Sequence, residues 1–348
     1  MKTINLSTLI RPHLIGMAPY SSARDDFKGQ AQVYLDANEN PFDNGLNRYP
    51  DPHQVEIKKI LSKIKKVATE NIFLGNGSDE AIDLLMQAFC EPGKDEVIIV
   101  PPTYGMYKVS ARINNIKIKE VVLDKEFNLD LPSLLSAIAP QTKIIFLCSP
   151  NNPTGNSLDQ FQVKKLLDEF NGLVVLDEAY IDFSDKPSWL AALDQYQNLI
   201  VLQTLSKAWG LASIRLGLCL AHPEIIRWLN LIKPPYNISG PSQLEAKRAL
   251  LLDDQMKEVV LKLKFQRELL RTELLKLSFI KKIYPSDANF LLVQTTDADA
   301  LYSYLSERGI IVRNRSKEPN CEDCLRMTIG TEEENKLLLD TLTKFETN

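Results

Sequence analysis

TLSKAWGLASIRLG, residues 204–217, sets a lysine and an arginine between two apolar runs. The runs at 199–202 and 216–221 are continuous rather than alternating, which is typical of strands buried on both faces of a sheet. Lys207 and Arg215 therefore follow a strand, and open α/β sheets bind ligands beyond the carboxyl ends of their strands. A lone lysine after a strand is usually solvated surface, so its meaning depends on what the neighbouring strands deliver to the same place.

Similar apolar runs precede this stretch, at 72–74, 97–100, 144–148 and 173–176. Helical patterns separate several of them, because after Gly77 the apolar residues at positions 82, 85, 86 and 89 fall on one face of a helix. Ser157-Leu158-Asp159-Gln160 predicts a capping box that opens another helix. This alternation predicts an α/β fold with a mostly parallel sheet flanked by helices.

The pattern changes after about residue 240. Residues 243–277 form a long, charged helical pattern with a break near 253 and 254. Three strand candidates and a last helix follow at 290–293, 310–313, 325–329 and 332–345. The change predicts a second, smaller α+β domain. Because the first forty residues show little periodicity, we expect an N-terminal arm at 1–40, a large domain at 41–245 and a small domain at 246–348.

Polar segments follow the strand candidates of the large domain. They are GNGSDE (75–80), PPTY (101–104), SPNNPTG (149–155), DEAY (177–180) and TLSK (204–207). Taken singly, each has an ordinary explanation as a tight turn, a loop or a helix cap. Taken together, five strand ends deliver polar groups to one rim of the sheet, which these ordinary explanations do not account for.

Together these segments supply the groups that hold one particular cofactor. The turn 75–78 opens a helix whose free N–H groups bind phosphate, and Thr204, Ser206 and Arg215 add hydroxyl and guanidinium contacts. A flat ring, hydrogen-bonding groups, a carboxylate and an amine come from Tyr104, Asn152, Tyr180, Asp177 and Lys207. A phosphate site, an aromatic face, an acid and a lysine predict pyridoxal phosphate (PLP) on Lys207, with Asp177 facing the pyridine nitrogen.

With LRMTIGT (325–331), these motifs resemble the fold type I PLP-dependent aminotransferases of the aspartate aminotransferase class. The resemblance implies that Lys207 carries the cofactor as a Schiff base and shuttles the proton, while Asp177 keeps the ring nitrogen protonated. It implies that Tyr104 stacks on the ring and that Arg326 clamps the anionic group of the substrate. The implied contacts to the phenolic oxygen are Asn152 and Tyr180, and those around the phosphate are Asn76, Gly77, Ser78, Thr204, Ser206 and Arg215.

A narrower resemblance connects the chain to the histidinol-phosphate aminotransferase family. The similar segments are MAPYSSAR (17–24), LDANENP (35–41), RYPD (48–51) and PYNIS (235–239). The resemblance implies amino transfer from histidinol phosphate to 2-oxoglutarate, in histidine biosynthesis. It also implies a homodimer in which Tyr49 reaches the cofactor phosphate of the neighbouring subunit. Tyr20 and Arg313 are further candidates for substrate binding.

Two other activities remain open at this point. Threonine-phosphate decarboxylases share the fold and most of the motifs, and they also handle a phosphorylated amine. Aromatic amino-acid aminotransferases are the other alternative. Release of carbon dioxide from threonine phosphate without consumption of 2-oxoglutarate would identify the decarboxylase.

Composition excludes broad classes of function. The net charge of −4 gives no general attraction to nucleic acid or to anionic membranes. No apolar run approaches the roughly 18–20 residues that span a bilayer, and residues 1–12 contain no apolar stretch of the signal-peptide type. We therefore expect a cytoplasmic protein without nucleic-acid or membrane partners.

The cysteines predict neither a disulfide scaffold nor a metal site. Five cysteines in a chain of 348 residues form no dense framework. Cys321 and Cys324 form a CxxC, but a second pair is lacking and the three histidines lie far away in the sequence. We interpret the pair as two incidental cysteines in a loop, and we expect no metal.

Overall fold

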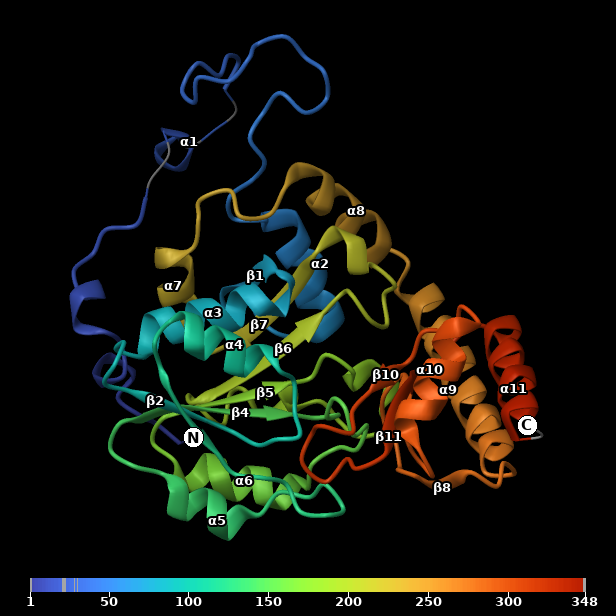
Figure 1. The fold of residues 1–348 in the computed structure, drawn as a ribbon. Helices are drawn as coiled ribbons and strands as arrows, with labels where there is room; N and C mark the ends of the chain where they lie inside the picture. Colours follow the sequence, from blue (N-terminus) through green and yellow to red (C-terminus); the bar gives the residue numbers. More distant parts are fainter. Residues whose placement is uncertain (1, 21–22, 28, 30, 347–348) are drawn as a thin grey trace.

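A seven-stranded sheet organises the larger part of the molecule (Figure 1). The computed structural model describes residues 2–20, 23–27, 29 and 31–346, so residues 21 and 22 of the 17–24 segment lie outside the described residues. The strand order is β1-β7-β6-β5-β4-β2-β3. The strands are β1 (Ile72–Asn76), β2 (Glu96–Ile99), β3 (Lys117–Glu120), β4 (Thr142–Cys148), β5 (Leu173–Asp177), β6 (Leu199–Thr204) and β7 (Leu216–Ala221).

The pairing in this sheet is mostly parallel, as predicted. Strands β3, β2, β4, β5 and β6 pair in parallel, whereas β7 runs antiparallel to both β1 and β6. The carboxyl ends of β4, β5 and β6 therefore meet at one edge. This is the edge to which the polar segments of the sequence are delivered.

Helices cover both faces of the sheet, and the side chains of successive residues in a strand point to opposite faces. Val97 and Ile99 pack into the core beneath one set of helices, whereas Ile98 packs into the core on the other side. The first face carries α3 (Gly77–Phe89), α4 (Met106–Ile113) and α7 (Pro223–Ile232). The second carries α2 (Val55–Lys65), α5 (Leu131–Ala137), α6 (Gln160–Glu169) and α8 (Gly240–Leu250). Short 3-10 helices occupy Leu6–Thr8, Pro12–Leu14, Thr69–Asn71, Ile181–Phe183, Trp189–Ala192 and Ala212–Ile214.

A second, four-stranded sheet with the order β10-β11-β9-β8 lies beside the large one (Figure 1). All its pairings are antiparallel. Its strands are β8 (Ile280–Ile283), β9 (Phe290–Thr295), β10 (Arg313–Asn314) and β11 (Cys324–Thr328). Its helices are α9 (Asp253–Leu274), α10 (Ala298–Glu307) and α11 (Glu332–Glu346). This is the expected small α+β unit with a core of its own.

The division between the two units remains a prediction. The expected division at 245 and 246 falls inside α8, which contacts α2 of the large unit. The predicted helix break lies at residues 251 and 252, between α8 and α9. We propose that the division lies in this break, because α9 contacts the small sheet through β9.

The N-terminal segment has two parts of different character. Leu6, Ile10 and Leu14 are buried in the core beside α3 and α7. The described residues between 15 and 49, among them the short helix α1 (Ala23–Asp26), project from the body and are called the projecting loop (Figure 1). Leu35 and Phe42 in this loop are 86% and 80% exposed. Such apolar exposure is unusual in a folded segment without a covering surface.

Candidate active site

A cavity of about 150 Å³ lies at the carboxyl ends of β4, β5 and β6. It gathers residues from five separate segments of the sequence. The residues predicted for the site that line it are Gly77, Ser78, Tyr104, Asn152, Asp177, Tyr180, Thr204, Ser206, Lys207 and Arg215. The sequence prediction that these strand ends share one rim agrees with this placement.

One end of the cavity is built to receive an anion. Helix α3 begins at Gly77, whose backbone has φ +70 and whose N–H donates to the Arg215 carbonyl at 2.8 Å. The Arg215 side chain lies in an ion pair with Asp79 at 3.7 Å. Free N–H groups at the start of a helix and a guanidinium both attract phosphate.

Gly217 allows β7 to approach this helix start. A Cβ atom at Gly217 would lie 2.1 Å from the backbone nitrogen of Ser78 and 2.2 Å from the carbonyl carbon of Gly77. No side chain fits there without displacement of the backbone. The glycine that ends the TLSKAWGLASIRLG stretch therefore positions the anion end of the cavity.

Asp177 ends β5 and is only 3% exposed. Its Oδ2 accepts a hydrogen bond from the Tyr107 hydroxyl at 2.6 Å, and its Oδ1 accepts one from the Ala179 N–H at 3.0 Å. Burial raises the pKa of Asp177 to about 6, although the bond from Tyr107 acts in the opposite direction. A buried carboxylate of this kind is stabilised by a cation, and a protonated pyridine nitrogen is one.

Lys207 borders the same cavity, with its Nζ 5.6 Å from the centre of the Tyr180 ring. Partial burial of the amine lowers the pKa of Lys207, and the nearby cations Arg326 and Arg215 lower it further. A lowered pKa leaves more of the amine neutral, which is the form that attacks an aldehyde or accepts a proton.

The small sheet also contributes to the site. Arg326 on β11 donates from Nη1 to the Asn152 Oδ1 at 2.5 Å, and its guanidinium lies 5.3 Å from the centre of the Phe290 ring. The Tyr180 ring meets the same Phe290 edge-on at 5.2 Å. The residues that line the cavity thus belong to the large unit, whereas Arg326, the predicted substrate clamp, belongs to the small sheet. The small sheet contacts the cavity residues at Asn152, through Arg326, and at Tyr180, through Phe290.

Tyr104 lies at the cavity wall between α3 and α4. Its hydroxyl donates to the Asp79 Oδ1 at 3.0 Å, and its ring packs edge-on against Tyr107 at 5.6 Å. Burial and the neighbouring Asp79 carboxylate raise the pKa of the Tyr104 hydroxyl. Its ring is therefore held in place from two sides, as a stacking platform for a flat ligand requires.

Four other residues predicted for the site do not line this cavity. The Asn76 side chain donates to the Asn237 carbonyl at 2.7 Å and is not among the residues that line the cavity. Arg313 is exposed and lies opposite Arg326 in the β10–β11 pair. Tyr20 and Tyr49 line a different cavity of about 390 Å³, together with Pro235 and Tyr236.

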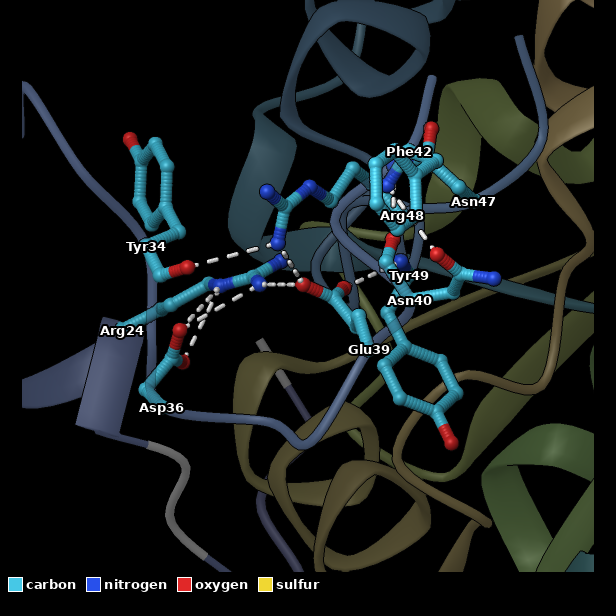
Figure 2. A network of polar contacts seen from close by, with 9 residues as sticks. All are labelled: Arg24, Tyr34, Asp36, Glu39, Asn40, Phe42, Asn47, Arg48 and Tyr49. Carbon is cyan, nitrogen blue, oxygen red and sulfur yellow. Dashed lines mark hydrogen bonds and ion pairs between the residues drawn. The ribbon is translucent and has the colours of Figure 1, made fainter. Parts of the chain in front are cut away.

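A buried carboxylate holds the projecting loop around Tyr49 in shape. Figure 2 shows Arg24 and Arg48 converging on Glu39, at 2.6 and 2.7 Å, while the Tyr49 N–H donates to the other carboxylate oxygen at 2.6 Å. Burial would raise the pKa of Glu39, but these hydrogen bonds outweigh it and lower the value to about 2. The Tyr49 ring stacks on Tyr236 at 4.5 Å. Tyr49 is thus firmly placed, and it is not among the residues that line the cavity of Lys207.

The sequence interpretation missed further residues of the site. Asp79 and Tyr107 bond to Tyr104 and Asp177, and Cys148, Ala179 and Ala212 also line the cavity. Asp79 stands inside the GNGSDE segment, so its place after a strand was a usable signal. Tyr107 has no such signal, because it follows the PPTY segment within α4 and reaches Asp177 only through the packing of α4 on the sheet.

Comparison with known proteins places this geometry in a family. A model of the aminotransferase class I and II family matches residues 23–342. A histidinol-phosphate aminotransferase of Christiangramia forsetii is 54% identical over 348 residues, which is 99% of each chain. One of Bacteroides thetaiotaomicron is 53% identical over 347 residues, covering 99% of this chain and 100% of the other.

Solved structures show the same fold. The histidinol-phosphate aminotransferase of Clostridium acetobutylicum superposes with a TM-score of 0.81 and 25% identity, covering 87% of this chain and 92% of the other. That of Sinorhizobium meliloti, in complex with pyridoxal-5'-phosphate, gives 0.79 at 25% identity, covering 86% and 83%. The L-threonine-O-3-phosphate decarboxylase of Porphyromonas gingivalis gives 0.74 at 21% identity over 87% and 92%, a likeness of fold alone.

Proposed function

The chain belongs to the family of class I and II aminotransferases, and we propose that it transfers the amino group of L-histidinol phosphate to 2-oxoglutarate, giving imidazole-acetol phosphate and L-glutamate. The observation that carries this proposal is identity above half with histidinol-phosphate aminotransferases along the entire chain. This favours the proposed activity over the decarboxylase and the aromatic aminotransferase. Histidine biosynthesis is the corresponding pathway.

The enzyme depends on PLP, and the cavity fits this cofactor. The helix start at Gly77 and Ser78, with Arg215, suits its phosphate, and the buried Asp177 suits its ring nitrogen. Lys207 lies in the same cavity, as covalent attachment requires. When bound, PLP supplies the electron sink for the carbon that carries the amino group.

We assign the protein's own contributions as follows. Lys207 Nζ would hold the cofactor and, once released, would accept the proton of the amine-bearing carbon, which its lowered pKa favours. Asp177, whose carboxylate is fixed by Tyr107, would keep the proton on the ring nitrogen of the cofactor. Asn152 and Tyr180, which line the cavity, would orient the cofactor ring by hydrogen bonds. Arg326 orients the substrate by its anionic group, and its planar fork suits phosphate and carboxylate alike.

A half-reaction tests the proposal. The PLP-loaded protein is mixed with histidinol phosphate without 2-oxoglutarate, and the absorbance spectrum is followed. We expect rapid conversion to the pyridoxamine form and its reversal by 2-oxoglutarate. An unchanged spectrum with histidinol phosphate, together with release of carbon dioxide from threonine phosphate, would assign the decarboxylase activity instead.

We further propose a homodimer in which Tyr20 and Tyr49 complete the site of the other subunit. Two observations support it: neither tyrosine lines the cavity of Lys207, and the loop that carries them exposes large apolar side chains. Co-expression of Lys207→Ala with Tyr49→Ala is the test. A shared site returns one intact site to each mixed dimer and restores activity, whereas sites confined to single chains leave both variants impaired after mixing.

The expected cytoplasmic location is also a proposal. It is supported by the five cysteines, which are all free and buried, as is usual where thiols stay reduced. Among the helices of the described residues, none is long and apolar enough to cross a membrane. Immunoblotting of cytoplasmic, periplasmic and membrane fractions of the producing cell checks the location.

A further inference from the structure

Cys321 and Cys324 are the two ends of one tight turn that leads into β11. The Cys324 N–H donates to the Cys321 carbonyl at 3.0 Å, and Asp323 inside the turn has φ +54. A four-residue turn of this kind holds its terminal Cα atoms less than about 7 Å apart. Disulfides join cysteines whose Cα atoms lie roughly 4.4–6.8 Å apart. The backbone therefore sets this pair at a spacing that a disulfide can span.

Both side chains lie on the face of the small sheet that is turned toward the large unit. Each is 0% exposed, and both pack into the core that contains Tyr284 and Phe290. The Tyr284 ring contacts the Phe127 ring of the large unit at 4.8 Å. Leu325, the residue after Cys324, packs instead into the small unit's own core. The two thiols therefore share one buried environment between the two units.

The pair differs from the other buried cysteines in its surroundings. Three cysteines lie in the core of the large unit, after α3 or within β4 and β7: Cys90, Cys148 and Cys219. The pair lies just below the surface of a loop, because Glu322 between the two cysteines is exposed. A loop opens locally at a lower cost in free energy than a central strand. An oxidant therefore reaches this pair more readily than the cysteines of the core.

The two thiols are also coupled to each other. A hydrogen bond between them raises the pKa of Cys321. The pair is not part of a metal centre, since the described parts of the chain contain no group of three or more His, Cys, Asp or Glu placed to hold a metal ion. The remaining chemistry for two adjacent thiols is reaction with each other.

The turn stands between two contacts that join the small unit to the large one. Just before it, the Asn320 side chain donates to the Leu123 carbonyl at 2.9 Å. Just after it, Arg326 donates to Asn152 at 2.5 Å. Two side chains in simple contact lie about 4 Å apart, whereas a disulfide brings its sulfur atoms to about 2.05 Å. Closing that gap shifts the turn, and the shift reaches Arg326 because it lies two residues after Cys324 on β11.

We propose that Cys321 and Cys324 form a reversible disulfide with a peroxide as oxidant, and that this disulfide weakens the binding of the substrate's anionic group by Arg326. The CxxC is then a modification site rather than two incidental cysteines. The effect on Arg326 rests on the proposed function, whereas formation of the disulfide does not.

The reaction balances with peroxide alone as co-reactant. One thiolate attacks a peroxide oxygen, the O–O bond breaks, and a sulfenic acid and the first water form. The sulfur of the second cysteine then attacks the sulfenic acid, so that the S–S bond forms and a second water leaves. Two electrons pass from the sulfurs to the peroxide, and both thiol hydrogens end in water. A dithiol such as dithiothreitol reverses the change by thiol–disulfide exchange.

Peptide mapping of the wild type tests the disulfide directly. The PLP-loaded protein is treated with hydrogen peroxide, its remaining thiols are alkylated in denaturant, and it is digested with trypsin. Cleavage after Lys317 and Arg326 releases residues 318–326, which contain Cys321 and Cys324 and no other cysteine. We expect this peptide to lose two hydrogen atoms and to resist alkylation, and we expect dithiothreitol to restore both thiols.

The three core cysteines serve as internal comparisons in the same digest and should remain open to alkylation. A peptide 318–326 that is still alkylated at both cysteines after peroxide would overturn the inference. Oxidation of the core cysteines at the same peroxide concentration would overturn it as well. Because the measurement uses the wild type, it does not depend on the folding of any variant.

The glutamate half-reaction, followed by absorbance, tests the effect on Arg326. The oxidised wild type should need about ten-fold more glutamate for half-saturation than the reduced protein, because a charged hydrogen bond is weakened. Cys321→Ala cannot form the disulfide and should not respond to peroxide. Cys90→Ala, at another fully buried cysteine, is the matched control and should respond like the wild type. An unchanged value in the oxidised wild type, or an equal loss in Cys321→Ala, would refute the effect on Arg326.

Failure of the proposed function gives a different result. If the reduced wild type does not react with histidinol phosphate, the proposed function is wrong, and peptide mapping still decides whether the disulfide forms. If that reaction proceeds but peroxide leaves residues 318–326 as a dithiol, the inference alone is wrong.

Discussion

Replacement of Asp177 by asparagine should raise the free energy of unfolding of the cofactor-free protein. It should lower the free energy of unfolding of the PLP-loaded protein. Asp177 is 3% exposed, and burial raises its pKa from an ordinary 3.8 to about 6. At about 1.4 kcal/mol per pKa unit, ionising this buried carboxyl costs about 3 kcal/mol of folding free energy. Asparagine has nearly the same shape, and its amide oxygen can accept one of the two existing hydrogen bonds.

The sign of the pH dependence follows from the raised pKa. The favourable contribution of protonated Asp177 is complete below pH 3.8 and is lost as the pH rises through about 6. Above that range the cofactor-free Asp177→Asn variant should be more stable than the wild type by about 3 kcal/mol, and near pH 4 the difference should close. With PLP bound, a protonated ring nitrogen compensates the carboxylate, so the wild type should be the more stable protein.

Urea unfolding of the cofactor-free and PLP-loaded proteins from pH 4 to pH 8 measures both effects. Protein concentration is held fixed, because association changes apparent stability. Asp254→Asn, at an aspartate whose side chain is 91% exposed, is the control and should show no such pH dependence. If the cofactor-free Asp177→Asn variant is no more stable than the wild type at pH 8, ionised Asp177 does not destabilise the cofactor-free protein and the reasoning is refuted.

Three further substitutions test other parts of the site. Lys207→Ala should abolish turnover and the absorbance of attached cofactor, and retained activity would remove Lys207 from the proposed role. Arg326→Ala should raise the half-saturating concentrations of histidinol phosphate and glutamate together, by roughly ten-fold or more because a charged hydrogen bond is lost; a change confined to glutamate would contradict the shared clamp. Gly217→Ala should destabilise the protein by about 1–3 kcal/mol, because its Cβ would meet the Ser78 backbone. It should also weaken PLP binding. Thermal melting measures the stability and cofactor titration measures the affinity. An unchanged affinity would show that Gly217 does not shape the anion end of the cavity.

The central strands were predictable because they are apolar on both faces. Strands β4, β5 and β6 occupy the expected runs within one or two residues at each end. The missed strands lack that signal. Lys117–Glu120 has the sequence KIKE and lies at the sheet edge, where three of its four residues are exposed. Charged residues suit an edge strand, so apolar continuity does not detect it.

Other errors came from local competition between polar side chains. The predicted capping box at 157–160 is wrong, because α6 begins at Gln160 with Asp159 as its cap, accepting from the Gln162 N–H at 2.9 Å. The Ser157 hydroxyl instead donates to Asp287 at 2.6 Å. Ser157 is thus bound to a residue 130 positions away in the sequence and does not cap the helix. A local sequence pattern does not reveal such a distant partner.

The same limit applies to the site itself. The residues that sit at strand ends could be placed together from sequence, because parallel strands bring their carboxyl ends to one edge. Tyr107 could not, since its contact with Asp177 depends on the packing of α4 on the sheet rather than on a strand end. Tyr20 and Tyr49 were proposed only through resemblance, and one chain does not bring them to Lys207.

The two sheets have different proposed tasks: the large sheet binds the cofactor, and the small sheet binds the anionic group of the substrate. The large sheet supplies Asp177 and Lys207, whose altered pKa values suit the cofactor. The small sheet supplies Arg326, whose proposed role is to bind an anionic group of the substrate. We therefore expect substitutions on β11 to change which anion is accepted while leaving proton transfer intact. Hybrid enzymes that exchange β11 (Cys324–Thr328) would measure how much of the substrate preference this strand carries.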